Sequence, residues 1–466
     1  MEDETATTLV GYNVHPPADR DAMLAAIGVS SIDDLFSQIP RAVRLTRELA
    51  LPGPMSEWEL ARHMRALASR NATTLTHLSF LGGGAYEHYI PAVVPAIVSR
   101  GEYLTAYTPY QPEMSQGLLR VLHDFQLVVG RLLGLPAVNC SVYDGATALA
   151  ESAWMASEIT RIRHVVVSEL IWRDSRTVLD TYMDGRGVTV SPVSCDRASG
   201  EIDLAALAVQ LERRPAAAVL VQTPNQAGVI EPLRRIADVA HAHGALLVAS
   251  WHPMLSGLCA TPGALGADIV CGDAQPLGLA LNAGGPYLGI MATRADHERH
   301  LPGRIVGECS DLKGEPALAL VKEEREQHVS RYNATSHICS NQAHLALRAL
   351  VYLCAVGEQG FRTIARLNAQ KAHWLCDRLS ALPGVTRAVS GRFFNEFLLQ
   401  LPCAAAPLLR ELQAEGIFGG LDYDRFGGTT GDRLLVAVTE VRSRAELERA
   451  AHAFEAALDR VGGRTT

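Results

Sequence analysis

The sequence predicts an α/β protein built around a large, mostly parallel β-sheet. Between about residues 75 and 300, apolar runs of strand length alternate with amphipathic stretches of helix length. The expected strands are HVVVSE, AAVLVQT, ALLVAS and ADIVCG, and two expected helices are DLAALAVQLER and RRIADVAHAHG. Such alternation is typical of a parallel sheet covered on both faces. Ligands of these sheets bind beyond the carboxyl ends of the strands, so the loops QTPNQAG, SWHPMLSG and GDAQPLG are expected to matter most.

Three regions are expected along the chain. Residues 1–70 are predicted to form an N-terminal helical arm, because helical patterns with serine caps and acidic first turns alternate there with breaks. Residues 71–325 are predicted to form the large α/β domain and residues 326–466 a small C-terminal α+β domain. Long helices are expected over residues 316–333 and 341–382. This order of parts resembles the aspartate-aminotransferase type (fold type I) of pyridoxal enzyme, by analogy of architecture alone.

Charge, hydropathy and cysteine content narrow the classes of function. The chain has 466 residues and a net charge of -8, which offers no basic face for nucleic acid. No run approaches the roughly 18 apolar residues that a membrane span needs. The acidic, polar start does not have the pattern of a signal peptide, and the nine cysteines include no CxxC or CxxxC pair. We therefore expect a cytoplasmic protein with reduced thiols, with neither nucleic acid nor membrane as a partner.

The loop after ADIVCG raises the central question about chemistry. In a pyridoxal enzyme, the residue after such a strand is often the lysine that holds the cofactor. Here the loop carries Asp273, Ala274, Gln275 and Pro276. The whole chain has three lysines, Lys313, Lys322 and Lys371. Two of them lie in helical patterns and one in a polar loop, whereas a Schiff base needs an amine at the carboxyl edge of the sheet. The sequence thus predicts a pyridoxal-enzyme scaffold without its lysine.

Two glycine-containing stretches could contribute to a ligand site. Residues 142–156 contain a turn, Gly145, Ala146 and Thr147, that opens into a helix. Backbone N–H groups at a helix N-terminus suit a phosphate, although a Gly-capped helix start packed on the sheet gives the same pattern. The stretch FLGGGAYEHYIP does not have the spacing of a phosphate-binding loop, so we expect a flexible turn that carries aromatic packing residues.

The stretch TAYTPYQPEMSQG, residues 105–117, is the densest polar segment of the chain. Its candidate functional residues are Tyr107, Tyr110, Gln111, Glu113 and Gln116. Polar crowding in a proline-fixed loop is poor material for a core and suits the orientation of a substrate, with a solvated loop as the alternative.

No metal site is expected from the histidines. His328 and His337 lie nine positions apart, in a charged helical pattern and in a loop. We expect both to be solvated or satisfied by local hydrogen bonds. Metal binding by the scattered cysteines is likewise not expected.

Several long motifs resemble one known family. They are MLAAIGVSSIDDLFSQIP, GGGAYEHYIPAVV, YTPYQPEMSQG, YDGATALAE, GDAQP, GGPYLG, REQH, ATSHICSNQA and LLVAVTE. Through these motifs the chain resembles, nearly end to end, subunit 1 (the α subunit) of the two-subunit glycine dehydrogenase (decarboxylating), the P-protein of the glycine cleavage system.

The resemblance implies that the chemistry depends on a second subunit. The α subunit resembles the N-terminal half of the single-chain P-protein, and pyridoxal phosphate belongs to the partner β subunit, bound through a His-Lys pair. Aligning GADIVCGDAQP with that pair puts Gln275 at the histidine position and Pro276 at the vacated lysine position. The implied assembly is (αβ)2. The family reaction decarboxylates glycine, a small amino acid, and passes the aminomethyl group to a lipoyl carrier protein.

The resemblance also implies where this chain touches the reaction. Sites in this fold class lie at the dimer interface, so residues 105–117 are expected to reach the partner's cofactor. Tyr107, Tyr110 and Gln111 would orient the substrate carboxylate or the pyridoxal ring, and Glu113 and Gln116 would hold the loop. The chain's own degenerate pocket would contain Gly145, Ala146, Thr147, His252 and Gln275. His252 stands where an acid would pair with the pyridine nitrogen.

Departures from the family pattern leave alternatives open. Asn333 replaces the basic residue that precedes ATS in the family, and His252 replaces the acid of SVDP-like segments. A specialised paralogue that acts on another small amino acid with its own β-like partner is the main enzymatic alternative. A purely structural or regulatory subunit and a self-sufficient homodimer are two others. The intact polar loop argues against the former, and the lysine count argues against the latter.

Overall fold

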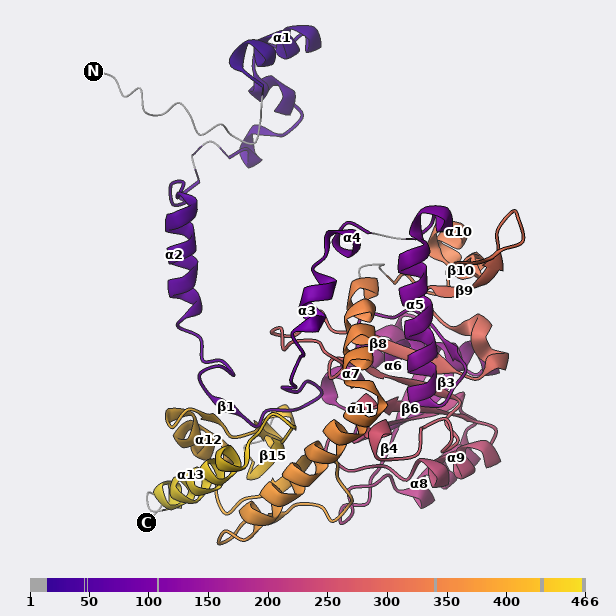
Figure 1. Cartoon of the computed structure of the whole chain (residues 1–466), viewed down its shortest axis with the longest axis vertical. Coiled ribbons are helices and arrows are strands. Elements are labelled where there is room, and N and C mark those ends of the chain that lie inside the picture. The colour runs from indigo at the N-terminus through magenta and orange to yellow at the C-terminus, as the bar shows by residue number, and fades with distance from the viewer. Residues whose placement is uncertain are drawn as a thin grey trace. The chain divides into compact units, whose positions relative to one another are not determined.

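The computed structural model describes residues 15–462 apart from residues 46, 48, 107, 108, 339–341 and 428–430. The chain divides into two compact units, Met1–Asn71 and Ala72–Thr466 (Figure 1). The domain boundaries that the sequence predicts stay predictions.

The first unit is helical, as the sequence predicts. Its elements are α1 (Pro17–Ile27), the 3-10 helices η2 (Ile32–Phe36) and η3 (Arg41–Val43), and α2 (Glu57–Ala68). Ser31 and Ser56 each accept the third amide of the helix that follows, and Gly28 ends α1 with a φ of 86°. No residue of these four helices is buried.

The second unit is organised around a seven-stranded sheet with the order β2-β8-β7-β6-β5-β3-β4. Neighbouring strands from β4 to β7 are parallel, and β8 is antiparallel to both β7 and β2. The strands are β2 (Ala137–Val138), β3 (His164–Ser168), β4 (Thr189–Val193), β5 (Ala218–Thr223), β6 (Leu246–Trp251), β7 (Ile269–Asp273) and β8 (Gly289–Thr293). The four predicted strands are β3, β5, β6 and β7, so the predicted α/β class is confirmed.

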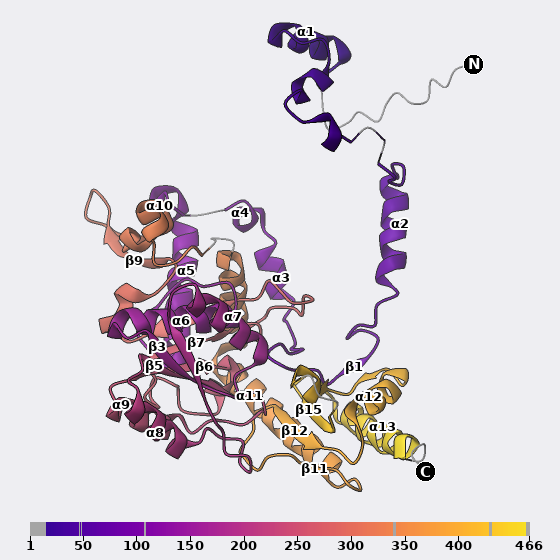
Figure 2. The same ribbon diagram turned by 180° about the vertical axis from the view of Figure 1, so that it is seen from behind.

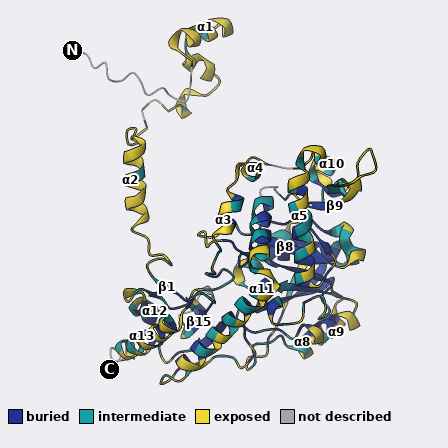
Figure 3. Cartoon of the chain, in the orientation of Figure 1, coloured by how far each residue is buried: buried dark blue, intermediate teal, exposed yellow. Residues whose placement is uncertain are grey.

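Helices cover both faces of this sheet, which explains why its strands are continuously apolar (Figures 1 and 2). One face packs against α5 (Pro112–Leu133), α8 (Leu204–Arg213), α9 (Leu233–Ala242) and α11 (Gln342–Ser380). The other packs against α6 (Gly145–Thr160) and α7 (Arg173–Asp184). Figure 3 shows the buried residues concentrated in the strands and in the helix faces toward them.

A second sheet, with the order β11-β12-β15-β14, belongs to the C-terminal part of the chain. Its elements are β11 (Thr386–Arg387), β12 (Glu396–Gln400), β14 (Leu421–Asp422) and β15 (Arg433–Ala437), with α12 (Ala405–Ala414) and α13 (Arg444–Gly462) packed on it. Strand β1 (Leu78–Ser79) pairs in parallel with β13 (Ile417–Phe418). The remaining elements are α3 (Val93–Val98), α4 (Gly101–Leu104), η4 (Pro253–Gly257), η5 (Ala295–His300) and η8 (Asp424–Gly427).

The prediction of a long helix over residues 316–333 is wrong. Strand β10 (Pro316–Val321) pairs instead with β9 (Ile305–Ser310) as an antiparallel hairpin. Its turn is closed by Asp311, whose carboxylate accepts the amides of Lys313 and Glu315. Local propensity does not reveal this pairing, because a strand partner supplies it. The rest of the segment forms short helices, η6 (Glu323–Arg325), α10 (Gln327–Ser330) and η7 (Arg331–Asn333).

Lys322 also lies in a different kind of segment from the one that the sequence predicts. Lys322 has a φ of 56° and lies between β10 and η6, rather than inside a helix. The other long predicted helix is confirmed as α11, with Gly357 at a φ of 62° marking a kink within it. Across the described residues, no helix combines the length and the apolar character that a membrane span requires.

The buried centre of the large sheet yields a stability prediction. Leu220 lies on β5 and is fully buried, with a relative exposure of 0%, whereas Leu258 is 46% exposed. Leu220→Ala leaves a cavity and is expected to lower the free energy of unfolding by about 2–5 kcal/mol. Leu258→Ala is the matched control, with an expected change below about 1 kcal/mol. Urea unfolding measures both, and equal losses would contradict this assignment of the core.

Candidate functional site

A cavity of about 280 Å³ opens at the carboxyl ends of β5, β6 and β7. Thr223, Trp251 and Asp273, each the last residue of its strand, line it. Its other described lining residues are Gly83, Gly84, Ala85, Tyr86, Asp144, Gly145, Ala146, Trp172, Asp174, Ser175, Gln222, Pro224, Ser250, His252, Pro276, Gly284 and Tyr287. The cavity thus occupies the place where open α/β sheets bind ligands, and these lining residues include no lysine or arginine.

Two carboxylates satisfy the amides at the N-terminus of α6. The Gly145 amide donates to Asp273 Oδ2 at 2.9 Å, and the Thr147 amide donates to Asp144 Oδ1 at 2.7 Å. The second oxygen of Asp273 accepts the Gln275 amide at 2.8 Å. The backbone of Gly145 approaches Asp273 closely, since a Cβ added to Gly145 would lie 2.9 Å from the Cβ of Asp273. The positive end of α6, which suits an anion, therefore already has anionic partners from this chain.

The environment of Asp273 makes its negative charge costly. Burial raises the pKa of this carboxyl to about 7, and the nearby charge of Asp144 acts in the same direction. The amide hydrogen bonds from Gly145 and Gln275 oppose that rise because they stabilise the carboxylate. A further anion at this end of α6 would meet both carboxylates.

His252 lines the same cavity as a neutral imidazole. Burial lowers its pKa to about 3. The Met254 amide donates to His252 Nδ1 at 3.3 Å, which leaves the ring proton on Nε2. That Nε2 is buried and has no hydrogen-bond partner among the described residues. His252 therefore offers no negative charge at the position where the sequence comparison expects an acid.

Pro276 and Gln275 have structural surroundings rather than catalytic ones. Pro276 lines the cavity at the predicted vacated lysine position and has no amine to offer. The Gln275 side chain is buried and is not among the described lining residues. Its amide group accepts the Tyr86 backbone N–H and donates to the carbonyl oxygens of Tyr86 and Leu279, each at 2.9 Å. It therefore ties this loop to the segment that contains the three consecutive glycines.

The glycine segment is tied to the C-terminal part of the chain by hydrogen bonds, which the sequence does not predict. The Gly83 amide donates to Glu396 Oε1 at 2.8 Å, and the Tyr86 hydroxyl donates to Glu396 Oε2 at 3.1 Å. Burial raises the pKa of Glu396 to about 7. A Cβ on Gly82 would lie 2.0 Å from Glu396 Oε1, so the contact requires glycine there.

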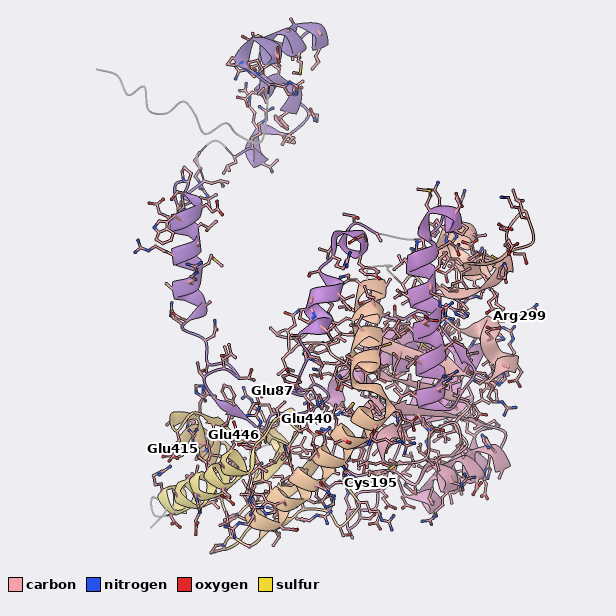
Figure 4. The ribbon with its side chains drawn as sticks, in the orientation of Figure 1. Glu87, Cys195, Arg299, Glu415, Glu440 and Glu446 are labelled. Atoms are coloured by element: carbon pink, nitrogen blue, oxygen red, sulfur yellow. The ribbon has the colours of Figure 1, made fainter. Side chains whose placement is uncertain are left out.

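A second carboxylate of the C-terminal part holds the same segment. His88 Nδ1 donates to Glu440 Oε2 at 2.7 Å, and the Tyr89 amide donates to Glu440 Oε1 at 2.8 Å. Burial by itself raises the pKa of Glu440, but the hydrogen bond and the charge of His88 outweigh it and lower the pKa. Figure 4 shows Glu440 close to Glu87, which forms an ion pair with Arg442.

The predicted polar loop lies apart from this cavity, since none of its described residues lines it. Tyr110 accepts a hydrogen bond from Arg304 Nη2 at 3.0 Å, and its ring packs on that of His328. The Gln116 side chain bonds to both backbone groups of Leu318 in β10, at 2.8 and 3.1 Å. Gln111 and Glu113 are exposed at the start of α5, and Tyr107 lies outside the described residues.

The structure thus separates the predicted site residues into two groups. Gly145, Ala146, His252 and Pro276 come together around the cavity, and Thr147 lies in the first turn of α6 beside them. The loop residues gather instead near β9 and β10. Sequence reasoning missed Asp144 and Asp273, although an aspartate before a helix and one at a strand end are recognisable signals. No group of three or more potential metal ligands occurs among the described residues.

Comparisons with known proteins agree with this architecture. The chain matches the family model of the glycine cleavage system P-protein over residues 12–454. It is 46% identical over 431 residues to the probable glycine dehydrogenase (decarboxylating) subunit 1 of Moorella thermoacetica, covering 92% of this chain and 96% of that protein. The protein of the same name from Brevibacillus brevis is 43% identical over 451 residues, covering 96% of this chain and 99% of the relative.

Solved structures show the same likeness. An inhibitor-bound glycine decarboxylase (P-protein) of the glycine cleavage system superposes with a TM-score of 0.85 at 36% identity, covering 96% of this chain and 99% of that chain. A sphingosine-1-phosphate lyase of Burkholderia pseudomallei, at 14% identity and a TM-score of 0.66, covers 91% of this chain and 96% of that chain and shares the fold alone. The predicted fold type I scaffold of pyridoxal enzymes is confirmed. The chain belongs to the glycine cleavage system P-protein family.

Proposed function

We propose that this chain is the α subunit of a two-subunit glycine dehydrogenase (decarboxylating), and that it completes the active site of a β subunit instead of holding the cofactor itself. The near full-length likeness to proteins named subunit 1 supports the assignment of this chain to that enzyme and implies a partner subunit. The observation that carries the second part is the occupation of the α6 N-terminus by Asp144 and Asp273. An (αβ)2 assembly of two α and two β chains, in the cytoplasm, is part of this proposal.

The lining residues of the cavity do not fit pyridoxal phosphate. The cofactor needs an amine for its aldehyde, a site for its phosphate and, in this fold class, an acid for its ring nitrogen. Pro276 and neutral His252 stand at the first and third of these positions. At the second, Asp144 and Asp273 already accept the first amides of α6, so the cofactor's phosphate would have to displace them.

The polar loop is the part of this chain that we assign to the reaction. When bound in the β subunit, pyridoxal phosphate would stabilise the carbanion that glycine decarboxylation leaves. Tyr107, Tyr110 and Gln111 orient the substrate carboxylate or the cofactor ring, which matters because the breaking bond has to stand perpendicular to that ring. Gln116 holds the loop by its hydrogen bonds to Leu318. Glu113, in the first turn of α5, also holds the loop. The aminomethyl product then passes to a lipoyl carrier protein.

The first unit supplies a further reason to expect a partner. Its helices bury none of their residues, yet they carry large apolar side chains, including Ile27, Phe36, Trp58, Leu60 and Leu67. Large apolar side chains on the surface of helices are characteristic of segments that pack against other protein. We assign this surface to contact with the β subunit.

The isolated chain is expected to take up no pyridoxal phosphate covalently. After incubation with the cofactor and reduction by borohydride, its intact mass should be unchanged, and it should not exchange labelled bicarbonate into glycine. The same chain co-expressed with the subunit 2 of its own genome should gain both properties. The adduct should then map to subunit 2 by peptide mass spectrometry.

The control for that experiment is a chain in which Lys313, Lys322 and Lys371 are all replaced by arginine. An adduct on the isolated wild-type chain that this variant loses would show that one of the three lysines reaches a cofactor, and the proposal would be wrong. Exchange activity of an assembled complex that does not change when Tyr107 and Tyr110 are both replaced by phenylalanine would instead favour a purely structural subunit.

The raised pKa of Asp273 predicts how stability depends on pH. A carboxyl with a folded-state pKa of about 7 and an ordinary value of 3.8 binds its proton more tightly in the folded state. Its contribution therefore favours folding at low pH and declines as the pH rises from about 4 to 7, by at most about 1.4 kcal/mol per pH unit. Asp273→Asn removes this decline, because asparagine does not titrate.

The measurement is urea unfolding of the wild type and of Asp273→Asn at several pH values. The free energy of unfolding of the wild type should fall relative to that of the variant between pH 4 and 7 and run parallel above it. Asp174→Asn is the matched control, because Asp174 lines the same cavity and is exposed. Parallel curves for wild type and Asp273→Asn over the whole range would refute the assigned environment of Asp273.

A further inference from the structure

Arg304 is a buried positive charge that the degenerate cavity does not explain. It follows Gly303 directly and precedes β9, and its relative exposure is 8%. Its Nη2 donates to the Tyr110 hydroxyl at 3.0 Å, and its guanidinium carbon lies 5.6 Å from the centre of the Tyr110 ring. Its Nε is buried and has no hydrogen-bond partner among the described residues. The guanidinium therefore retains donor capacity beside the polar loop.

The charged residues near Arg304 are paired with one another rather than with it. Within the described part of the chain, Arg304 forms no ion pair with a carboxylate. The buried acid Glu326, next to Arg325 in the sequence, lies 3.9 Å from the Arg325 guanidinium. Arg325 donates to the carbonyl oxygens of Lys322, Leu301 and Gly303, so it braces the turn that presents Arg304. A buried charge without a counter-ion is costly, and arginine cannot relieve that cost by losing its proton.

The surroundings of Arg304 open toward the surface of the loop. Tyr110 is 44% exposed, and its hydroxyl, which accepts from Arg304, can still donate its own proton. A cavity of about 20 Å³, room for about one water molecule, is lined by Arg304 together with Pro109, Cys140 and Ser141, among others. The start of α5 lies beside α10 and β9 in both views (Figures 1 and 2), and its N-cap Gln111 makes no side-chain capping bond.

We propose that Arg304 and the Tyr110 hydroxyl together bind an oxyanion presented by the active site of the partner subunit. The anion is either the carboxylate of the amino-acid substrate or the phosphate of the cofactor, both of which suit the planar fork of a guanidinium. The inference rests on the proposed function, because the anion arrives with the partner. Arg304 would supply a positive charge, which the lining residues of this chain's own central cavity do not provide.

The test uses the complex of this chain with the subunit 2 of its genome. Arg304→Gln, Arg304→Lys and Tyr110→Phe are compared with the wild type for two constants, the Kd of pyridoxal phosphate by absorbance titration and the KM for glycine in bicarbonate exchange. Arg304→Gln is expected to weaken one of them about tenfold or more, as the loss of a charge-assisted hydrogen bond does. Arg304→Lys keeps the charge and should recover part of that loss. Arg176→Gln, which removes a guanidinium paired with Asp180 on α7, is the matched control and should change neither constant.

The constant that changes identifies the anion. A weaker Kd for the cofactor with an unchanged KM assigns the phosphate, and a raised KM with an unchanged Kd assigns the substrate carboxylate. If the Arg304→Gln chain does not assemble with subunit 2, the other two variants test the proposal. Arg304→Lys and Tyr110→Phe must then both weaken the same constant.

The two proposals fail in different ways. If the wild-type complex is active and all three variants keep both constants within twofold, the role of Arg304 is refuted and the proposed function stands. If the wild-type complex neither binds the cofactor nor exchanges bicarbonate, the proposed function fails, and the assignment of Arg304 fails with it.

Discussion

The first amides of α6 need hydrogen-bond acceptors, and the identity of those acceptors determines what the central cavity can hold. In this chain, the acceptors are the carboxylates of Asp144 and Asp273, at 2.7 and 2.9 Å. The same helix end would otherwise suit the phosphate of a cofactor. The chain thus keeps the sheet, the crossover helices and the cavity of a pyridoxal enzyme, while its own side chains take the anionic position. Pro276 and neutral His252 line the same cavity, so it offers neither a lysine amine nor an acid at these two places.

Hydrogen bonds fasten the surrounding loops to other parts of the chain. Glu396 and Glu440, both from the C-terminal part, hold the glycine segment through Tyr86 and His88, and Gln275 joins it to the strand ends. At a separate place, Gln116 fastens the polar loop to β10, and Arg304 reaches Tyr110. The positive charge that an anionic ligand requires is therefore found beside the loop, whereas the cavity is acidic. This division of charge is consistent with two chains that share one site.

Much of the fold could be predicted from the sequence, because buried parallel strands are continuously apolar and the helices between them carry recognisable caps. The assignment of Pro276 to a vacated lysine position stays a prediction, and the structure places Pro276 in the lining of the cavity. The parts that sequence reasoning missed depend on partners far along the chain. Gly145 and Asp273 are 128 positions apart, and Tyr110 and Arg304 are 194 apart. The apolar residues of the segment 316–333 also suit a helix, and only the pairing of β10 with β9 makes its first six residues, Pro316–Val321, a strand.

The most direct test of this account is a crystal structure of the chain in complex with its subunit 2 and pyridoxal phosphate. The account predicts the cofactor in the pocket of subunit 2, with the segment of residues 105–117 of this chain in contact with that pocket. It also predicts that the hydrogen bond from the Gly145 amide to Asp273 stays intact in this chain. Cofactor density in the cavity of this chain, with Asp273 displaced from α6, would contradict it.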